Sequence, residues 1–255
     1  MISKMVCIAS LILVLVLALG SKTWAQPTQP PATCSNATLS GNNGFVVTGI
    51  NPSGPTVTTG QITADGKGRF SGVETVSNNG TIEQNISIKG TYKIRANCTG
   101  SGTTTVKGAS TFHFDFVVVS AGTALEFVLT DAGTTESGST QAQGAATCSS
   151  NGVQGTYGLQ ANGILVGLGP IALNGQVKLH RGVISGTTSG SVNGQTFTAE
   201  KVSGLYKVGS TCRGGAVISV NQSRLGLSLV VVNGGKQILF IDTDKGLVVS
   251  GSLQQ

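Results

Sequence analysis

Hydrophobic and polar residues alternate over short stretches along most of the chain. Phe112, Phe114 and Phe116 share one side of such a stretch, and His113 and Asp115 share the other side. Alternation with a period of two is typical of a β-strand that has one face in a protein core. The sequence offers no amphipathic run with the period of a long helix. The pattern therefore predicts an all-β protein built from short antiparallel strands.

Turn-forming residues separate the predicted strands. The Asp65-Gly66 and Asn79-Gly80 pairs supply the positive φ angles that tight hairpin turns need. Short turns pair each strand with the next, so we expect a meander, and an eight-stranded meander removes its free edges by closing into a barrel. In the first half the strands are predicted at residues 44–50, 57–64, 69–76, 81–88, 91–97, 102–107, 111–119 and 124–129, with a terminal segment after a turn at 130–133.

The chain repeats itself. "GTYKIRANCTG" at residues 90–100 returns as "GLYKVGSTCRG" at 204–214, and "FHFDFVVV" at 112–119 returns as "LGLSLVVV" at 225–232. The offset stays within a residue of 114 (204 − 90), which places the small insertions in turns. Internal repetition of this kind indicates two copies of one structural unit. About a hundred residues per copy suits a small barrel or sandwich. A single sheet shared by both copies is the alternative.

Four cysteines follow the same repeat. Cys34 and Cys98 are 64 residues apart (98 − 34), and so are Cys148 and Cys212 (212 − 148). Four cysteines allow three connectivities. Duplication favours Cys34–Cys98 and Cys148–Cys212, because a unit copied whole carries its own disulfide. The rival use, metal binding, lacks CxxC spacing and has only two histidines in the whole chain.

The first residues resemble an export signal. Lys4 precedes an apolar run at residues 11–19, and Thr23-Trp24-Ala25 offers a cleavage site before Gln26. We predict cleavage after Ala25, a Pro-rich linker at 26–33, a first barrel at 34–143 and a second at 144–255. The mature protein is then secreted or periplasmic and does not span a membrane. The alternative is an uncleaved anchor, which the shortness of the apolar run disfavours.

The valine-rich ends of two strands are apolar on both faces, as in strands that are buried on both sides. The outward members are Val117 and Val119 in the first copy and Val230 and Val232 in the second. We predict that these four valines pack barrel against barrel or form a dimer contact.

The two predicted interiors differ in side-chain size. The first copy directs many phenylalanines inward, so we expect its interior to be filled. The second copy places mostly smaller residues there, so a ligand pocket is expected in the second copy. Its predicted lining is Tyr206, Leu225, Leu227, Leu229 and Phe240.

Charge and motifs offer little chemistry. Residues 34–147 carry six basic and seven acidic side chains, and residues 148–255 carry eight and three. The basic second half has no Lys/Arg run and no basic residues interleaved with aromatic ones, which argues against nucleic-acid binding. His113 and Asp115 share a strand face, but nothing in the sequence places a nucleophile beside them. We therefore predict no catalytic residues, no metal and no cofactor.

The segments "GNNGF", "GQITADGKGRFSG", "GTYKI" and "TDAGT" occur in that order along the first copy. In this the chain resembles a group of uncharacterised exported bacterial proteins of the acidobacterial type. The resemblance extends to the second copy, where the "ADGKG" turn has become "LHRG". It implies a bacterial, exported, barrel-like protein and implies no activity.

Two functional hypotheses follow from the sequence. The first is a non-enzymatic module that binds a small apolar ligand, since an eight-stranded barrel can hold one. The alternative is a structural or adhesive surface protein that acts through contacts with other proteins, including self-association.

Overall fold

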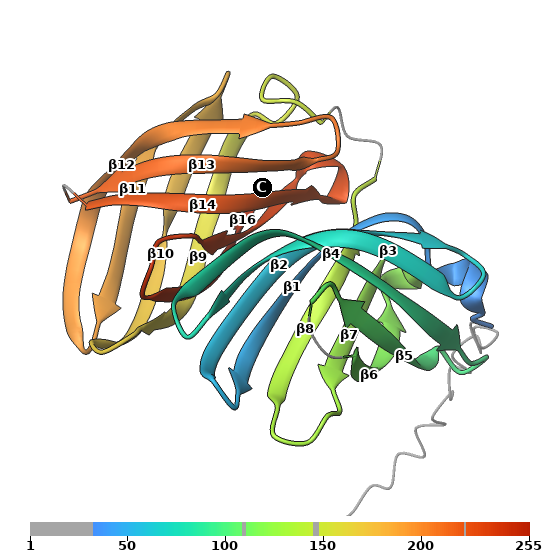
Figure 1. The fold of residues 1–255 in the computed structure, drawn as a ribbon. Helices are drawn as coiled ribbons and strands as arrows, with labels where there is room; N and C mark the ends of the chain where they lie inside the picture. Colours follow the sequence, from blue (N-terminus) through green and yellow to red (C-terminus); the bar gives the residue numbers. More distant parts are fainter. Residues whose placement is uncertain (1–32, 109–110, 145–147, 222) are drawn as a thin grey trace, which may run out of the picture. The chain divides into compact units, whose positions relative to one another are not determined.

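The computed structural model describes residues 33–108, 111–144, 148–221 and 223–255, and it is all-β (Figure 1). In these ranges sixteen strands form two closed antiparallel barrels of eight strands each. The prediction of two tandem meander barrels is confirmed. The predicted signal segment, and the predicted linker up to Ala32, lie outside the described residues.

The first barrel follows chain order from β1 to β8, and β8 closes it by pairing with β1. Its strands are β1 (Ser40–Asn51), β2 (Gly54–Asp65), β3 (Arg69–Asn78), β4 (Thr81–Ile94), β5 (Thr99–Val106), β6 (Thr111–Val119), β7 (Ala124–Leu129) and β8 (Thr135–Ala142).

The second barrel has the same topology and closes by pairing β16 with β9. Its strands are β9 (Gly155–Leu165), β10 (Gly169–His180), β11 (Val183–Val192), β12 (Gln195–Val208), β13 (Arg213–Val220), β14 (Ser223–Val232), β15 (Gln237–Asp242) and β16 (Leu247–Gln254).

The duplication extends to irregular features of the backbone. Both barrels interrupt the pairing of their third and fourth strands at equivalent places, between Glu74 and Val76 in the first and between Thr188 and Gly190 in the second. Both fourth strands carry a residue with positive φ there, Asn85 at 59° and Ala199 at 54°. A β-bulge retained in both copies is a feature of the shared unit.

The strand prediction was wrong at one place. Residues 81–88 and 91–97 were expected to be separate strands, but β4 runs unbroken from Thr81 to Ile94. Gly90 does not end the strand, because Phe70 stands directly opposite on β3. The Phe70 ring lies in the space that a side chain on Gly90 would need, since a methyl group there would be 2.3 Å from its Cζ. The expected terminal segment is β8, so each barrel has eight strands.

Outward-facing side chains of β14, β15 and β16 are buried against outward-facing side chains of β1 and β2. Val230, Val232 and Leu239 form one buried cluster against Val46. A second buried cluster consists of Val57, Ile241 and Val248. Hydrogen bonds flank the clusters, including one from Ser77 Oγ to the Leu247 carbonyl at 2.5 Å and one from the Gly246 amide to the Gly80 carbonyl at 2.9 Å.

The four outward valines therefore have different surroundings. Val230 and Val232 are buried between the barrels. Val117 is 40% exposed on the outer face of the first barrel, and Val119 is half-buried. The exposed Val117 lies apart from the buried clusters between the barrels, and its outer face carries Asp115 on the same strand and Glu126 on β7. A dimer contact through the first-copy valines stays a prediction.

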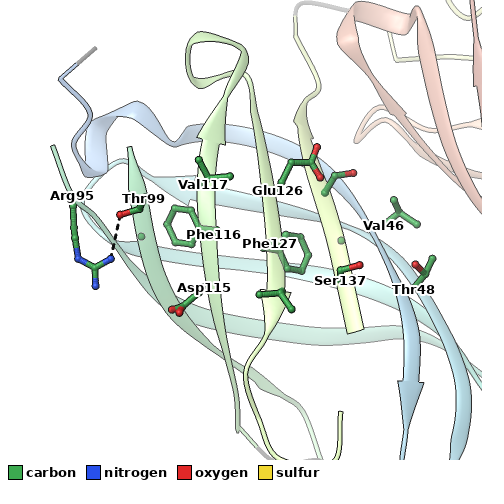
Figure 2. Close-up of a pocket in the computed structure, with 14 residues that line it drawn as sticks. Val46, Thr48, Arg95, Thr99, Asp115, Phe116, Val117, Glu126, Phe127 and Ser137 are labelled. Atoms are coloured by element: carbon green, nitrogen blue, oxygen red, sulfur yellow. Dashed lines mark hydrogen bonds between the residues drawn. The ribbon is translucent and has the colours of Figure 1, made fainter. Parts of the chain in front are cut away.

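The outer face around Val117 is hollowed into an open groove of about 710 Å³ (Figure 2). Strands β1, β5, β6, β7 and β8 contribute side chains to it. The labelled charged residues are Arg95, Asp115 and Glu126, and Arg95 reaches the Thr99 hydroxyl at 3.4 Å. The groove lies on the outside of the barrel wall and is distinct from the barrel interior.

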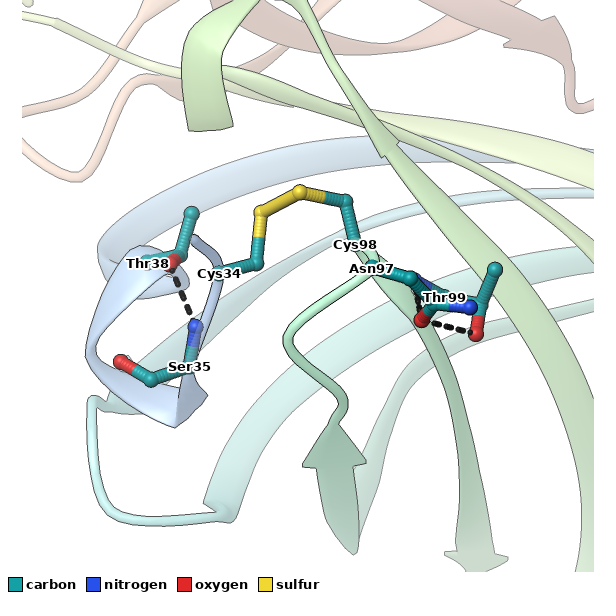
Figure 3. Close-up of a disulfide and its surroundings, with 6 residues drawn as sticks. All are labelled: Cys34, Ser35, Thr38, Asn97, Cys98 and Thr99. Atoms are coloured by element: carbon teal, nitrogen blue, oxygen red, sulfur yellow. Dashed lines mark hydrogen bonds between the residues drawn. A yellow bond between two sulfur atoms is a disulfide. The ribbon is translucent and has the colours of Figure 1, made fainter. Parts of the chain in front are cut away.

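Each barrel carries its own disulfide. Cys34 pairs with Cys98 and Cys148 with Cys212, each across 64 residues, so the predicted connectivity is confirmed. In the first barrel the bond joins the segment before β1 to the turn between β4 and β5 (Figure 3). The Ser35 amide donates to Thr38 Oγ1 at 3.0 Å, which holds the short 3₁₀ turn Asn36–Thr38 beside the bond. Two disulfides fit an oxidising compartment.

Candidate ligand-binding site

The first barrel encloses a cavity of about 280 Å³. Its lining comes from inward-facing positions on all eight strands of that barrel. Most of the lining is aromatic or aliphatic, and a minority of polar side chains lies among it. The lining comprises Leu39, Phe45, Val47, Asn51, Thr56, Thr58, Ile62, Phe70, Glu74, Val76, Asn78, Glu83, Ile86, Ile88, Tyr92, Thr104, Val106, Phe112, Phe114, Phe116, Leu125, Phe127, Leu129, Glu136 and Thr140.

Residues before β1 form the floor of the cavity. Leu39 is buried in the barrel core. The Tyr92 hydroxyl donates to the Leu39 carbonyl at 2.7 Å and to the Asn36 carbonyl at 3.2 Å, and the Ile94 amide donates to Asn36 Oδ1 at 2.8 Å. Together with the Cys34–Cys98 bond, these contacts fix the segment across that end of the barrel.

The opposite end of the cavity reaches the hairpin turns. Asn51, Asn78 and Leu129 line it, and each is the last residue of its strand. The cavity is therefore apolar at the disulfide end and becomes polar toward the end where the hairpins turn.

Phenylalanines line this cavity without filling it, because five of them stand directly opposite glycines on neighbouring strands. A methyl group on Gly102 would lie 2.4 Å from Cζ of Phe114, and one on Gly100 would lie 2.2 Å from Cζ of Phe116. Each ring thus extends over its glycine, along the barrel wall. The pairs are Phe45–Gly60, Phe70–Gly90, Phe114–Gly102, Phe116–Gly100 and Phe127–Gly138.

The expectation of a filled first interior is therefore wrong. It counted the volume of the phenylalanines and did not allow for the space left by glycine partners. Neighbouring rings also contact one another at their edges, with the Phe114 centroid 5.9 Å from that of Phe116 and 6.0 Å from that of Phe127. Tilted and edge-on contacts at such separations are favourable for aromatic pairs and stiffen the wall.

The second barrel retains one of these aromatic pairs, Phe240 over Gly251, where a methyl group would lie 2.4 Å from the ring. Tyr206, Leu229 and Phe240 are buried members of its core, and Leu227 packs against that core. Leu225 is half-buried at the start of the same inward row. A ligand pocket lined by these five residues stays a prediction.

Three glutamates line the cavity of the first barrel. Glu74 lies on β3, Glu83 on β4 and Glu136 on β8. Glu74 is only 8% exposed, whereas Glu83 is exposed at the turn end and Glu136 is half-buried. Burial, together with repulsion from Glu136 and Glu83, raises the pKa of Glu74 to about 7. Burial also raises the pKa of Glu136.

Three polar atoms of the lining lack a hydrogen-bond partner among the described residues. They are Thr140 Oγ1, Thr104 Oγ1 and Asn78 Oδ1. Thr140 is only 6% exposed, so its hydroxyl is cut off from bulk solvent. Leaving such a group unpaired costs about 1–3 kcal/mol. A polar group placed in the cavity would recover part of that cost.

The raised pKa of Glu74 makes the protein less stable as the pH rises. The folded protein holds a proton on Glu74 up to about pH 7, whereas a glutamate in the unfolded chain releases it near pH 4.5. The contribution of Glu74 to stability is therefore full below pH 4.5 and is lost as the pH rises to 7. We expect Glu74→Gln to be as stable as wild type near pH 4.5 and up to about 3 kcal/mol more stable than wild type above pH 7. Urea unfolding at the two pH values measures this.

The control for this prediction is Glu126→Gln on β7, because Glu126 is exposed on the outer face of the same barrel. Its unfolding midpoint should follow wild type at both pH values. Asp242 in the second barrel also has a pKa raised to about 7 by burial, so part of the pH dependence should persist in Glu74→Gln. A Glu74→Gln protein that lost stability equally at both pH values would contradict the assignment.

Other classes of site find less support in the structure. No group of three or more His, Cys, Asp or Glu side chains within the described ranges could hold a metal ion. His113 contacts Asp131 at 2.8 Å on the surface, and Asp115 has no part in that contact. None of the helices in the described part of the chain is long and apolar enough to cross a membrane.

The fold and the cavity define a duplicated, disulfide-bonded protein of two eight-stranded barrels. Comparison with protein families finds no match, and comparison with curated proteins finds none. Among solved structures, kievitone hydratase from Nectria haematococca is 8% identical, with a TM-score of 0.30 over 89% of this chain and 93% of that one. CghA is 8% identical, with a TM-score of 0.27 over 84% and 88%. Likenesses this weak carry no argument about function.

Proposed function

We propose that the protein binds a small, largely apolar molecule inside its first barrel and does not transform it. The observation that supports this is the cavity of about 280 Å³, held open by phenylalanines that lie over glycines. The volume is close to the lower end of small-molecule sites, about 300–1,000 Å³. Apolar walls with a few polar groups at one end are the usual composition of such sites.

Export is part of the same proposal. The two disulfides fit an oxidising compartment, and the predicted signal segment would deliver the chain to the periplasm or the cell exterior. The resemblance to exported bacterial proteins points the same way. In an oxidising compartment outside the cytoplasm, a disulfide-bonded barrel would keep an apolar molecule out of water.

Filling the cavity should abolish binding. Val76 lines the cavity on β3, and a phenylalanine at this position would project into the empty volume. We expect wild type to bind indole, a neutral probe, and Val76→Phe to bind it at least about tenfold more weakly. Titration followed by NMR measures both affinities.

The matched control is Val128→Phe, which adds the same ring on the outer face of β7, where the valine is exposed. It should bind indole like wild type. Equal loss in both variants, or no binding of indole by folded wild type, would refute a ligand site in the first barrel.

The alternative, a structural or adhesive role through protein contacts, stays a prediction. Light scattering on the purified protein tests it, because an adhesive module that acts by self-association should give a molar mass that rises with concentration. A constant monomer mass would count against self-association.

A further inference from the structure

The charges that line the first cavity all have one sign. Glu74, Glu83 and Glu136 are acidic, and the described lining contains no lysine, arginine or histidine. They come from three different strands, so the negative charge is a property of the cavity and not of one segment. Within the described ranges none of the three has a salt-bridge partner. Asn51 donates a hydrogen bond to Glu136, whereas Glu74 projects into the cavity.

We propose that the occupant of the first barrel carries a basic nitrogen, and that this ammonium group sits among Glu74, Glu136 and the polar lining while its apolar body lies against the phenylalanines. The inference rests on the proposed function and names the chemical class of the ligand. A buried carboxylate without a partner is costly, and a cation in hydrogen-bonding geometry offsets that cost.

The unpartnered polar atoms match the donors of an ammonium group. An ammonium has three N–H donors and no acceptor, so it requires acceptors around it. Asn78 Oδ1 and the hydroxyl oxygens of Thr104 and Thr140 are acceptors that lack partners within the described structure. Thr140 lies on the same inward row of β8 as Glu136, and Asn78 lies on the same inward row of β3 as Glu74. A neutral hydrocarbon would leave all three atoms unpaired.

The aromatic wall suits the rest of such a ligand. Phe45 lies between Glu74 and Thr140 in the cross-strand order, because Glu74 pairs with Gly60, Gly60 with Phe45, and Phe45 with Thr140. The negative face of an aromatic ring attracts a cation within about 6 Å. An aryl-alkyl amine combines the two requirements: its ring packs against the phenylalanines and its nitrogen meets the carboxylates.

Binding of a cation should be linked to the protonation of Glu74. The titratable groups that line the cavity with it are Glu83 and Tyr92 on β4 and Glu136 on β8. A carboxylate that binds an ammonium must be ionised, so ligand binding competes with the proton on Glu74. Amine affinity should therefore rise with pH across the range in which Glu74 titrates, and binding near pH 7 should release protons.

The test compares three probes that share a phenyl ring and differ in the end group: 2-phenylethylamine, 2-phenylethanol and phenylacetate. Calorimetry with the full protein at about pH 8 should give affinities that decrease from the amine to the alcohol to the carboxylate. The amine should bind at least about tenfold more tightly than the alcohol. At about pH 5 this preference should shrink, and in two buffers of different ionisation enthalpy the amine should show proton release at neutral pH.

Glu74→Gln should remove most of the preference for the amine and abolish the proton release, while the alcohol binds as before. Glu126→Gln, on the outer face of the same barrel, should leave all three affinities unchanged. Binding of the alcohol also shows that the variant is folded and its cavity intact.

Two different results would overturn the two claims separately. Alcohol binding as tight as amine binding, with both lost in Val76→Phe, would refute the basic nitrogen and leave the cavity as a site for neutral molecules. If folded wild type bound none of the three probes, the proposed function itself would fail.

Discussion

Replacing both Cys34 and Cys98 with serine should lower the free energy of unfolding by about 4 kcal/mol, the value expected for opening a loop of this size. The disulfide spans 64 residues and joins the segment before β1 to the turn between β4 and β5. The same segment closes the floor of the cavity through Asn36 and Leu39. Urea unfolding followed by circular dichroism measures the loss.

The matched control is the double serine variant of Cys148 and Cys212, whose disulfide also spans 64 residues. Its loss of stability should be similar, but only the variant in the first barrel should weaken probe binding in the cavity. A first-barrel variant that kept its stability and its affinity would show that the segment before β1 is held by its hydrogen bonds alone.

Phe116→Ala should destabilise the first barrel by about 3–5 kcal/mol, the usual cost of deleting a buried phenylalanine ring. Phe116 is only 5% exposed, stands opposite Gly100 and contacts Phe114. Alanine would leave a gap on both strands at once, because Gly100 contributes no side chain to fill it. The unfolding midpoint in urea measures the effect.

Two further variants provide comparisons for the loss of stability in Phe116→Ala. Phe116→Leu introduces the residue that the second copy carries as Leu229, and its loss of stability should be smaller than that of Phe116→Ala, because leucine keeps much of the buried apolar volume. Val128→Ala on the outer face should change stability by less than about 0.5 kcal/mol. If Phe116→Ala behaved like Val128→Ala, the ring would not be part of the wall.

Features that repeat in the sequence were predictable from it. The equal spacing of Cys34–Cys98 and Cys148–Cys212 indicated the disulfides, because a duplicated unit keeps its own crosslink. The hairpin turns were also readable. Asn79 and Gly80 adopt positive φ angles of 48° and 76°, as do Asn193 and Gly194 at 47° and 82°. These features depend on residues close in sequence or on the repeat itself.

The cavity was not predictable in the same way, because it depends on which residues face one another across strands. Phe114 opposite Gly102 leaves room, whereas Phe114 opposite another large residue would not. Register of this kind is set by the whole barrel. One signal was present: Glu74 follows Phe70 and Gly72 in the alternation of β3, which directs its carboxylate inward. An inward glutamate in an otherwise apolar row is an indication of a polar site.

The contact between the barrels was also hard to predict from the valines alone. Val117 and Val230 occupy equivalent places in the repeat, so the alternation of their own strands does not tell which one is covered. Their neighbours differ, however, since Glu126 stands where the second copy has Leu239. A patch with a carboxylate at its centre cannot be buried as cheaply as one with a leucine.

The contact between the barrels uses different faces of the repeated unit, namely β14–β16 of the second copy against β1 and β2 of the first. A head-to-tail contact of this type closes into a ring if the rotation between units allows it, and otherwise adds units as in a filament. Growth at the first barrel would need a further unit to offer its first two strands to the β6–β8 face. That face carries Asp115 and Glu126 in place of Ser228 and Leu239, so it does not offer the apolar surface that the second barrel uses for its contact.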